Sequence, residues 1–229
     1  GADKLGSGLS VATVAMGNLI SSGIQAALSG IQELGSAIWN LDEATEEYRV
    51  AQGKLTTAFE AAGYSGDAAQ KSYTEFYKIL GDTDTATEAS QLLAQLAENE
   101  QDITKWTNIA AGVYGTFGDA LPIEGMIESA NETAKVGEVT GSLADALNWV
   151  GISEDAFNEK LAACSSESER NRLIMETLSG AYDEASGAFY RNNEALVASR
   201  EGQAQLDATL AGLGETISNV KNSLRAEFL

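Results

Sequence analysis

The chain contains 229 residues, which suits one large domain or two small ones, and it has no histidine and a single cysteine. These absences exclude Ser-His-Asp and Cys-His catalysis, zinc sites that use histidine and any disulfide within the chain. The single proline favours an all-α fold over a β-sandwich or barrel, and the net charge of −20 predicts neither specific nucleic-acid binding nor a basic face for anionic lipid.

The segment Leu5–Gln32 contains no charged residue. It is long enough for a membrane-spanning helix, but it holds few strong hydrophobes and many Gly, Ser, Thr, Asn and Gln residues. We therefore expect a helix packed against sister chains or a neighbouring subunit. Contact of this segment with a host membrane is the alternative.

A heptad pattern predicts that residues 1–62 form a long amphipathic helical segment, partly free of charge. From Ile20 to Ala62, mostly apolar residues alternate at spacings of four and three, which places them on one face of a helix about 65 Å long. The alternative is a helix that is broken near Gly35 or Asn40 and folds back on itself. The residues expected to pack or to self-associate on this face are Ile24, Ile31, Leu34, Ile38 and Leu55.

Residues 63–165 are predicted to form a compact helical domain, because turn signals separate short helical segments. The expected helices are Asp67–Leu80, a helix that begins with a Thr85/Glu88 capping box and ends near Ala97, Ile103–Phe117 capped by Asp102, Ile123–Val136, Ser142–Val150 and Ser153–Ala163. The residues expected in the core of this domain are Trp106, Tyr114, Phe117 and Trp149.

Residues 166–229 are predicted to form a second long helix with a heptad pattern. Ser166 and Glu169 form a capping box at its start, and apolar residues recur every seven positions from Met175 onward. Polar residues in the middle of the pattern weaken this face or fix its register. The residues expected to pack or to self-associate here are Leu206, Leu210, Leu213 and Ile217. The predicted fold is thus all-α, with two long helices flanking a compact bundle of short ones.

No arrangement of residues predicts catalysis, a cofactor or a metal. The nearest candidate is Asp82-x-Asp84, but a calcium loop starting at Asp82 needs glycine and glutamate where the chain has Thr87 and Leu93. Helix capping explains these carboxylates, and the glutamate clusters elsewhere are typical of solvated helix faces. The chain is therefore not expected to be an enzyme.

About half of the chain resembles one known family. The stretches that carry the resemblance are KLTTAFEAAGYSGDAA (Lys54–Ala69), LGDTDTATEASQLLAQLA (Leu80–Ala97) and the long block Ile103–Leu178, which begins ITKWTNIAAGVYGTFGDALPIEGMIESANETAKVGEV. They are similar to phage tail tape-measure proteins, in particular those of phages and prophages from gut Firmicutes.

The resemblance implies a structural role. Tape-measure proteins are long helical chains in the lumen of a growing tail tube; their length sets the tail length, and they leave the tube ahead of the DNA. The implied partners are further copies of the chain (a homo-oligomer, commonly a trimer), the tail tube protein, tail-assembly chaperones and tail-tip proteins. The implied location is the tail lumen of the virion, after synthesis in the host cytoplasm. The alternative function is a helical membrane-associated or pore-forming effector module led by Leu5–Gln32.

Overall fold

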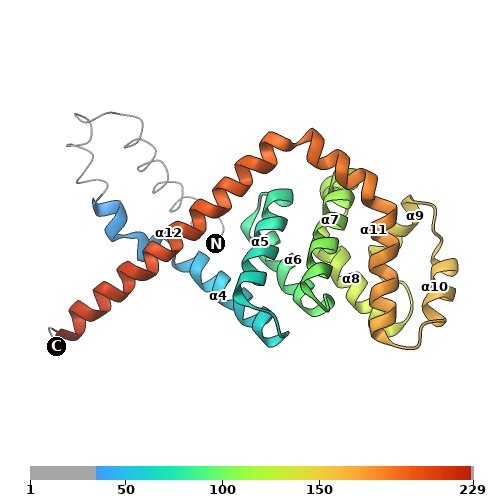
Figure 1. The fold of residues 1–229 in the computed structure, drawn as a ribbon, viewed down its shortest axis with the longest axis horizontal. Helices are drawn as coiled ribbons and strands as arrows, with labels where there is room; N and C mark the ends of the chain where they lie inside the picture. The colour runs from blue at the N-terminus through green and yellow to red at the C-terminus, as the bar shows by residue number, and fades with distance from the viewer. Residues whose placement is uncertain (1–34, 228–229) are drawn as a thin grey trace. The chain divides into compact units, whose positions relative to one another are not determined.

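The computed structural model describes residues 35–227, and the regular structure in this range is entirely helical, as the all-α prediction requires (Figure 1). The described residues divide into two compact units, one made of residues 35–54 and 202–227 and one made of residues 55–201. In chain order the elements are α3 (Leu41–Ala44), α4 (Glu46–Ala61), α5 (Gly66–Leu80), α6 (Thr83–Leu96), α7 (Glu100–Phe117), the 3-10 turn η1 (Gly118–Ala120), α8 (Ile123–Val136), α9 (Leu143–Trp149), α10 (Glu154–Ala162), α11 (Glu167–Asn192) and α12 (Glu194–Glu227).

The described part of the first predicted long helix is interrupted at two positions. Residues 35–39, α3 and α4 follow one another, with interruptions at Asn40 and Thr45. Backbone bonds from Asn40 N–H to Ser36 O (3.0 Å) and from Arg49 N–H to Thr45 O (2.8 Å) keep the helical hydrogen-bond pattern through both sites. The Thr45 hydroxyl also donates to Leu41 O, a local bond that bends helices. The helix is therefore interrupted near Asn40, as one alternative expected, but it does not fold back there.

Turn chemistry sets the helix ends of the unit of residues 55–201. Pro122 precedes α8 and Gly137 follows it at φ 81°, and these two residues give the bounds that the sequence predicts. The Ser166 hydroxyl accepts from Glu169 N–H (3.1 Å), which confirms the predicted capping residue of α11.

Two predicted helix starts are wrong by a few residues. Asp82 caps α6, which confirms the capping interpretation of that carboxylate, and the predicted Thr85/Glu88 capping box is wrong: the Asp82 carboxylate accepts from Thr85 N–H at 2.8 Å. Asn99 rather than Asp102 caps α7, and Asp102 instead accepts from Glu98 N–H (2.9 Å) from inside the first turn. In both cases a capping side chain lies three residues before the residue that the sequence suggested.

The core of this unit centres on the contact between α7 and α11, which lie side by side (Figure 1). Gly112 of α7 faces the backbone of α11, and a Cβ atom there would lie 2.6 Å from Tyr182 O. The absence of a side chain thus allows the two backbones to approach closely. Buried side chains around this contact include Trp106, Ile109, Val113, Ile174, Leu178 and Tyr182.

The second predicted long helix is broken, which corrects the prediction of one unbroken element. α11 ends at Asn192, and Asn193 adopts φ −125° while its side-chain amide donates to Phe189 O at 2.9 Å. The backbone N–H of Asn193 also donates to Phe189 O (3.1 Å) and Val197 N–H donates to Asn193 O (2.8 Å), so helical hydrogen bonds span the interruption while the dihedral angles of Asn193 leave the helical range. The register also changes there: Tyr182 and Phe189 are buried as the heptad pattern predicts, but Leu196 is exposed and Val197 is buried in its place.

The compact unit is larger than the domain that the sequence suggested. It extends from Leu55 to Glu201, whereas the predicted domain covered residues 63–165. The difference is mainly α11, whose apolar face completes the core instead of flanking it.

Candidate functional surfaces

The residues predicted to pack or to self-associate fall into three groups. Ile24, Ile31 and Leu34 lie outside the described residues. Leu55 and Leu210 are fully buried, and Leu206 and Ile217 are half-buried. Ile38 and Leu213 are exposed, so their contact with a further copy of the chain stays a prediction.

Exposed apolar side chains form a line along the C-terminal half of α12. Leu213, Val220 and Leu224 are each 42 to 43 % exposed, and Ile217 lies between them. The spacing of four, three and four residues places all four side chains on one helix face. We call these four residues the α12 stripe; all four lie on the heptad pattern of the sequence, which singled out Leu213 and Ile217 for self-association.

A different face of α12 packs against α3 in the unit that contains both. A Cβ atom on Gly214 would lie 2.7 Å from Leu41 O, so glycine is needed at this crossing. Nearby, Lys221 Nζ lies 2.7 Å from Asp42 Oδ1 and 5.3 Å from the centre of the Trp39 ring. The hydrogen bond from Lys221 lowers the pKa of Asp42 below its ordinary value. The α12 stripe is thus separate from the face that holds α12 within its own unit.

Asp207 is a buried carboxylate on α12. It is 4 % exposed, and Gln203 Nε2 donates to its Oδ1 at 2.7 Å. Burial removes water from the charged form and raises the pKa of Asp207 above its ordinary 3.8, and the bond from Gln203 lowers it only in part. A carboxylate with a raised pKa is more favourable in the folded protein when it is protonated.

We expect Asp207→Asn to stabilise the unit that contains α12 at neutral pH. Because the pKa is raised by folding, the stabilising contribution of the protonated acid is fully present below pH 3.8 and is lost as pH rises through the folded pKa. Asparagine keeps the bond from Gln203 without the charge, so its advantage is expected near pH 7 and absent near pH 3. Urea unfolding followed by 19F NMR of 5-fluorotryptophan at Trp39 measures this difference; an equal advantage at both pH values would contradict it.

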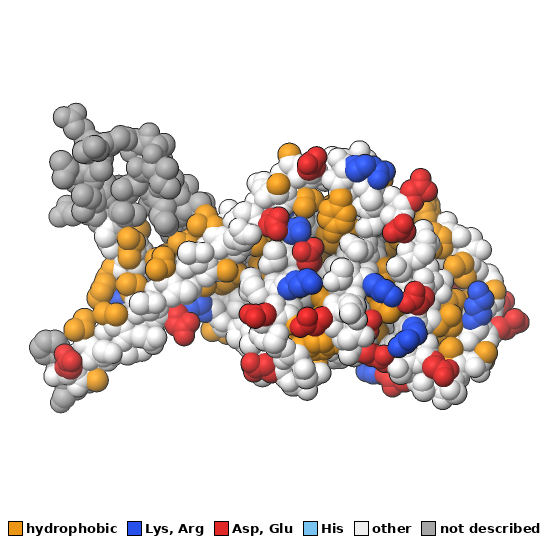
Figure 2. Space-filling view, viewed as in Figure 1, with side chains coloured by type: hydrophobic (Ala, Val, Ile, Leu, Met, Phe, Trp, Pro, Cys, Tyr) orange, Lys and Arg blue, Asp and Glu red, His pale blue; other side chains and the backbone are white. Residues whose placement is uncertain are grey.

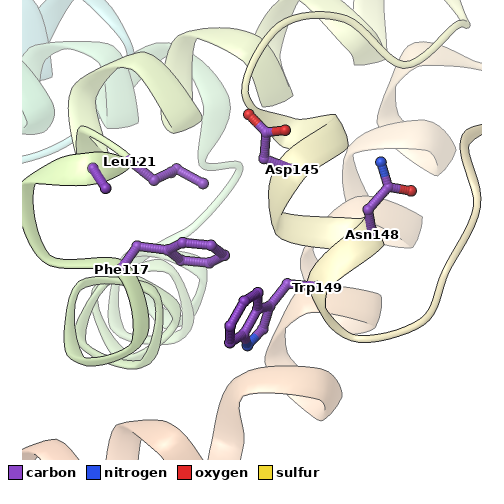
Figure 3. Close-up of a pocket in the computed structure, with 6 residues that line it drawn as sticks. Phe117, Leu121, Asp145, Asn148 and Trp149 are labelled. Atoms are coloured by element: carbon purple, nitrogen blue, oxygen red, sulfur yellow. The ribbon is translucent and has the colours of Figure 1, made fainter.

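A hollow of about 420 Å³ lies between the end of α7, η1 and α9 (Figure 3). Its lining residues are Phe117, Ala120, Leu121, Asp145, Asn148 and Trp149. The rings of Phe117 and Trp149 meet edge to face, with centroids 5.3 Å apart and planes at 62°. Asp145, Asn148 and Trp149 lie on one face of α9 because they are three and four residues apart.

Trp149 belongs to this surface and not to the core, so its predicted core position is wrong. Its side chain is 66 % exposed, whereas Trp106 is fully buried and Tyr114 and Phe117 are half-buried. α9 buries Leu143, Ala146 and Leu147, and Trp149 projects from a different side of this short helix.

Two contacts fix α9 and hence the hollow. The Tyr182 hydroxyl of α11 donates to Ala146 O at 2.6 Å. Gly151, at φ 82°, reverses the chain after α9, and Ile152 N–H donates back to Leu147 O at 3.0 Å. The last turn of α9, which carries Asn148 and Trp149, is therefore held in place from both sides.

Residues 35–227 contain neither a cluster suited to a metal ion nor a helix suited to span a membrane. No cluster of three or more acidic or cysteine side chains in this range is arranged to hold a metal ion. None of the helices in the described part of the chain is long and apolar enough to span a membrane. The segment Leu5–Gln32, on which the membrane alternative depends, lies outside the described residues.

Comparison of the chain with known protein families, curated proteins and solved structures identifies no related protein. No protein-family model matches the chain, and neither a curated protein nor a solved structure is similar to it at a significant level.

Proposed function

We propose that this chain is a structural section of a phage tail tape-measure protein and has no catalytic role. The proposal is supported by the resemblance of Lys54–Ala69, Leu80–Ala97 and Ile103–Leu178 to that family, by the all-α fold and by the α12 stripe. Its proposed partners are further copies of itself, the tail tube protein, tail-assembly chaperones and tail-tip proteins.

The observation that carries the proposal is the α12 stripe. Four apolar side chains at heptad spacing on an exposed helix face are the pattern by which helices bundle with copies of themselves. A bundle of parallel helices has a constant rise of about 1.5 Å per residue, which suits a protein that measures length.

The charge of the chain fits the same role. Figure 2 shows acidic and basic side chains interspersed on the visible face, and over the whole chain 34 acidic residues outnumber 14 basic ones, for a net charge of −20. Such a surface repels the phosphate backbone, so the protein would not retain DNA that must pass through the same tube.

Tail length tests this function directly. Two additional copies of residues 213–226, inserted in frame after residue 226 in the phage protein, add 28 residues and preserve the heptad register. If this section measures length as extended helix, tails in electron micrographs are expected to lengthen by about 42 Å.

A flexible Gly-Ser insert of the same length is the matched control. It lacks a fixed rise per residue, so it is expected to give a broader distribution of tail lengths without the same increment. Normal tails of unchanged length with the heptad insert would contradict the proposed role.

A further inference from the structure

The hollow between α7, η1 and α9 places the aromatic rings of Phe117 and Trp149 beside the carboxylate of Asp145, and the proposed structural role uses none of these groups (Figure 3). We propose that it binds the guanidinium group of an arginine side chain presented by a partner protein. In this arrangement the guanidinium lies against the exposed indole face of Trp149 and pairs with the carboxylate of Asp145. This inference is independent of the proposed function and depends only on the geometry of α7, η1 and α9.

The indole ring of Trp149 is held in position and is exposed, so a planar cation could stack on it. Phe117 contacts it edge to face, and the side chain still exposes 66 % of its surface. The face of an indole ring is electron-rich, and among side-chain cations the flat guanidinium stacks on it best. The contact with Phe117 and the fixed last turn of α9 reduce the entropy that would be lost on binding.

Asp145 supplies the complementary charge one helical turn before Trp149. Asp145 is exposed, and no lysine or arginine is among the six residues that line the hollow. A carboxylate accepts two parallel N–H bonds from a guanidinium, which orients the ligand as well as attracting it. The amide oxygen of Asn148, on the same face of α9, is a further acceptor for the remaining donors.

The surrounding sequence favours a cation over a neutral ligand. Residues 118–155 contain eight acidic residues and one lysine. These residues create a negative electrostatic potential around the hollow. A neutral sugar ring could stack on an exposed indole but would not be attracted by this potential, whereas a basic segment of a partner would be attracted and steered by it.

The chain itself provides a parallel for this chemistry. In the other unit, Trp39 and Asp42 are three residues apart, and Lys221 both lies over the Trp39 ring and pairs with Asp42. Asp145 and Trp149 form a similar pair, four residues apart on one helix face, without a cation of the chain in the lining. Asp145 and Trp149 can thus provide a cation of a partner with the same two contacts, an aromatic face and a carboxylate, that Trp39 and Asp42 provide for Lys221.

Binding of an arginine peptide to the full chain tests the proposal. The chain is labelled with 5-fluorotryptophan, and Trp149→Phe identifies which of the three 19F signals belongs to Trp149. An acetylated and amidated Gly-Arg-Gly peptide is expected to shift the Trp149 signal saturably and to leave that of the buried Trp106 unchanged. The matched peptide with citrulline, which has the same shape without the charge, is expected to cause no saturable shift.

Two charge variants separate the pairing from the general acidity of the region. Asp145→Asn is expected to weaken binding of the arginine peptide about fivefold, as for a solvent-accessible ion pair. Asp119→Asn removes the same charge from η1, outside the lining, and is expected to leave the affinity unchanged. An unchanged Trp106 signal shows that each variant is folded. Equal binding of the citrulline peptide, or equal losses in the two variants, would overturn the proposal.

Discussion

Gly112→Ala is expected to destabilise the compact unit of residues 55–201 by about 3 kcal/mol, at the upper end of what overpacking costs. The new methyl group would lie 2.6 Å from Tyr182 O, 2.9 Å from Tyr182 Cβ and 3.2 Å from Ser186 N. Ordinary contacts between carbon atoms are about 3.5 to 4.0 Å, and two of these three atoms belong to the backbone of α11. Since a backbone cannot rotate away as a side chain can, α7 and α11 would have to separate and lose packing along their length.

Gly180→Ala is the matched control for this substitution. Gly180 lies in the interior of α11 with no atom within 4 Å of a new Cβ atom, so alanine there is expected to stabilise the unit by about 0.5–1 kcal/mol. Urea unfolding followed through the 19F signal of Trp106 measures both variants on the same unit. Equal effects of the two substitutions would show that the contact between α7 and α11 is looser than the structure has it.

The short helices were predicted well because local residues determine their ends. Pro122 and Gly137 bound α8 through their own backbone preferences, and Ser153 and Ser166 cap the next helices with their own hydroxyl groups. At the starts of α6 and α7 the sequence offers two capping residues within one turn, and the Thr85/Glu88 capping box and Asp102 are the wrong ones. Periodicity alone cannot decide between such neighbours.

The break at Asn193 and the role of Trp149 depend on information that the heptad pattern does not contain. The heptad pattern continues through Asn193 in the sequence, but Asn193 adopts φ −125° and interrupts the helix, with its side-chain amide also bonded to Phe189 O. Tryptophan is a residue type expected in a core. The short helix α9, however, buries only the side that carries Leu143, Ala146 and Leu147, and Trp149 lies on another side. An aspartate four residues before a tryptophan on the same helix face was the signal that could have indicated a surface site.

Leu213→Glu combined with Val220→Glu is expected to abolish self-association of the chain. Both side chains lie on the α12 stripe, seven residues apart, where a helix of a second copy would cover them. Each chain then loses the burial of two apolar side chains, which lowers the free energy gained on association by roughly 3 kcal/mol per chain. This loss weakens association about a hundredfold for each chain in the assembly. Sedimentation equilibrium measures the mass of the assembly and hence the number of copies, for which the resemblance implies three.

Gln205→Glu combined with Asn219→Glu is the matched control for the stripe. Both positions are exposed on α12 and lie away from the stripe, so the variant gains the same two charges without touching the proposed interface. It is expected to associate like the original chain, and circular dichroism checks that both variants remain helical. A chain that is monomeric before substitution, or two variants that dissociate equally, would contradict a specific role for the stripe.

Salt provides an independent test of the same interface. Copies that each carry a charge of −20 repel one another, and added salt screens this repulsion while strengthening apolar burial. Association through the stripe is therefore expected to strengthen as the salt concentration rises, whereas association through ion pairs would weaken. The face of α12 at Gly214 contacts α3 and the stripe is a separate, exposed apolar face, so with a second copy bound there the heptad pattern of this helix would serve two different interfaces.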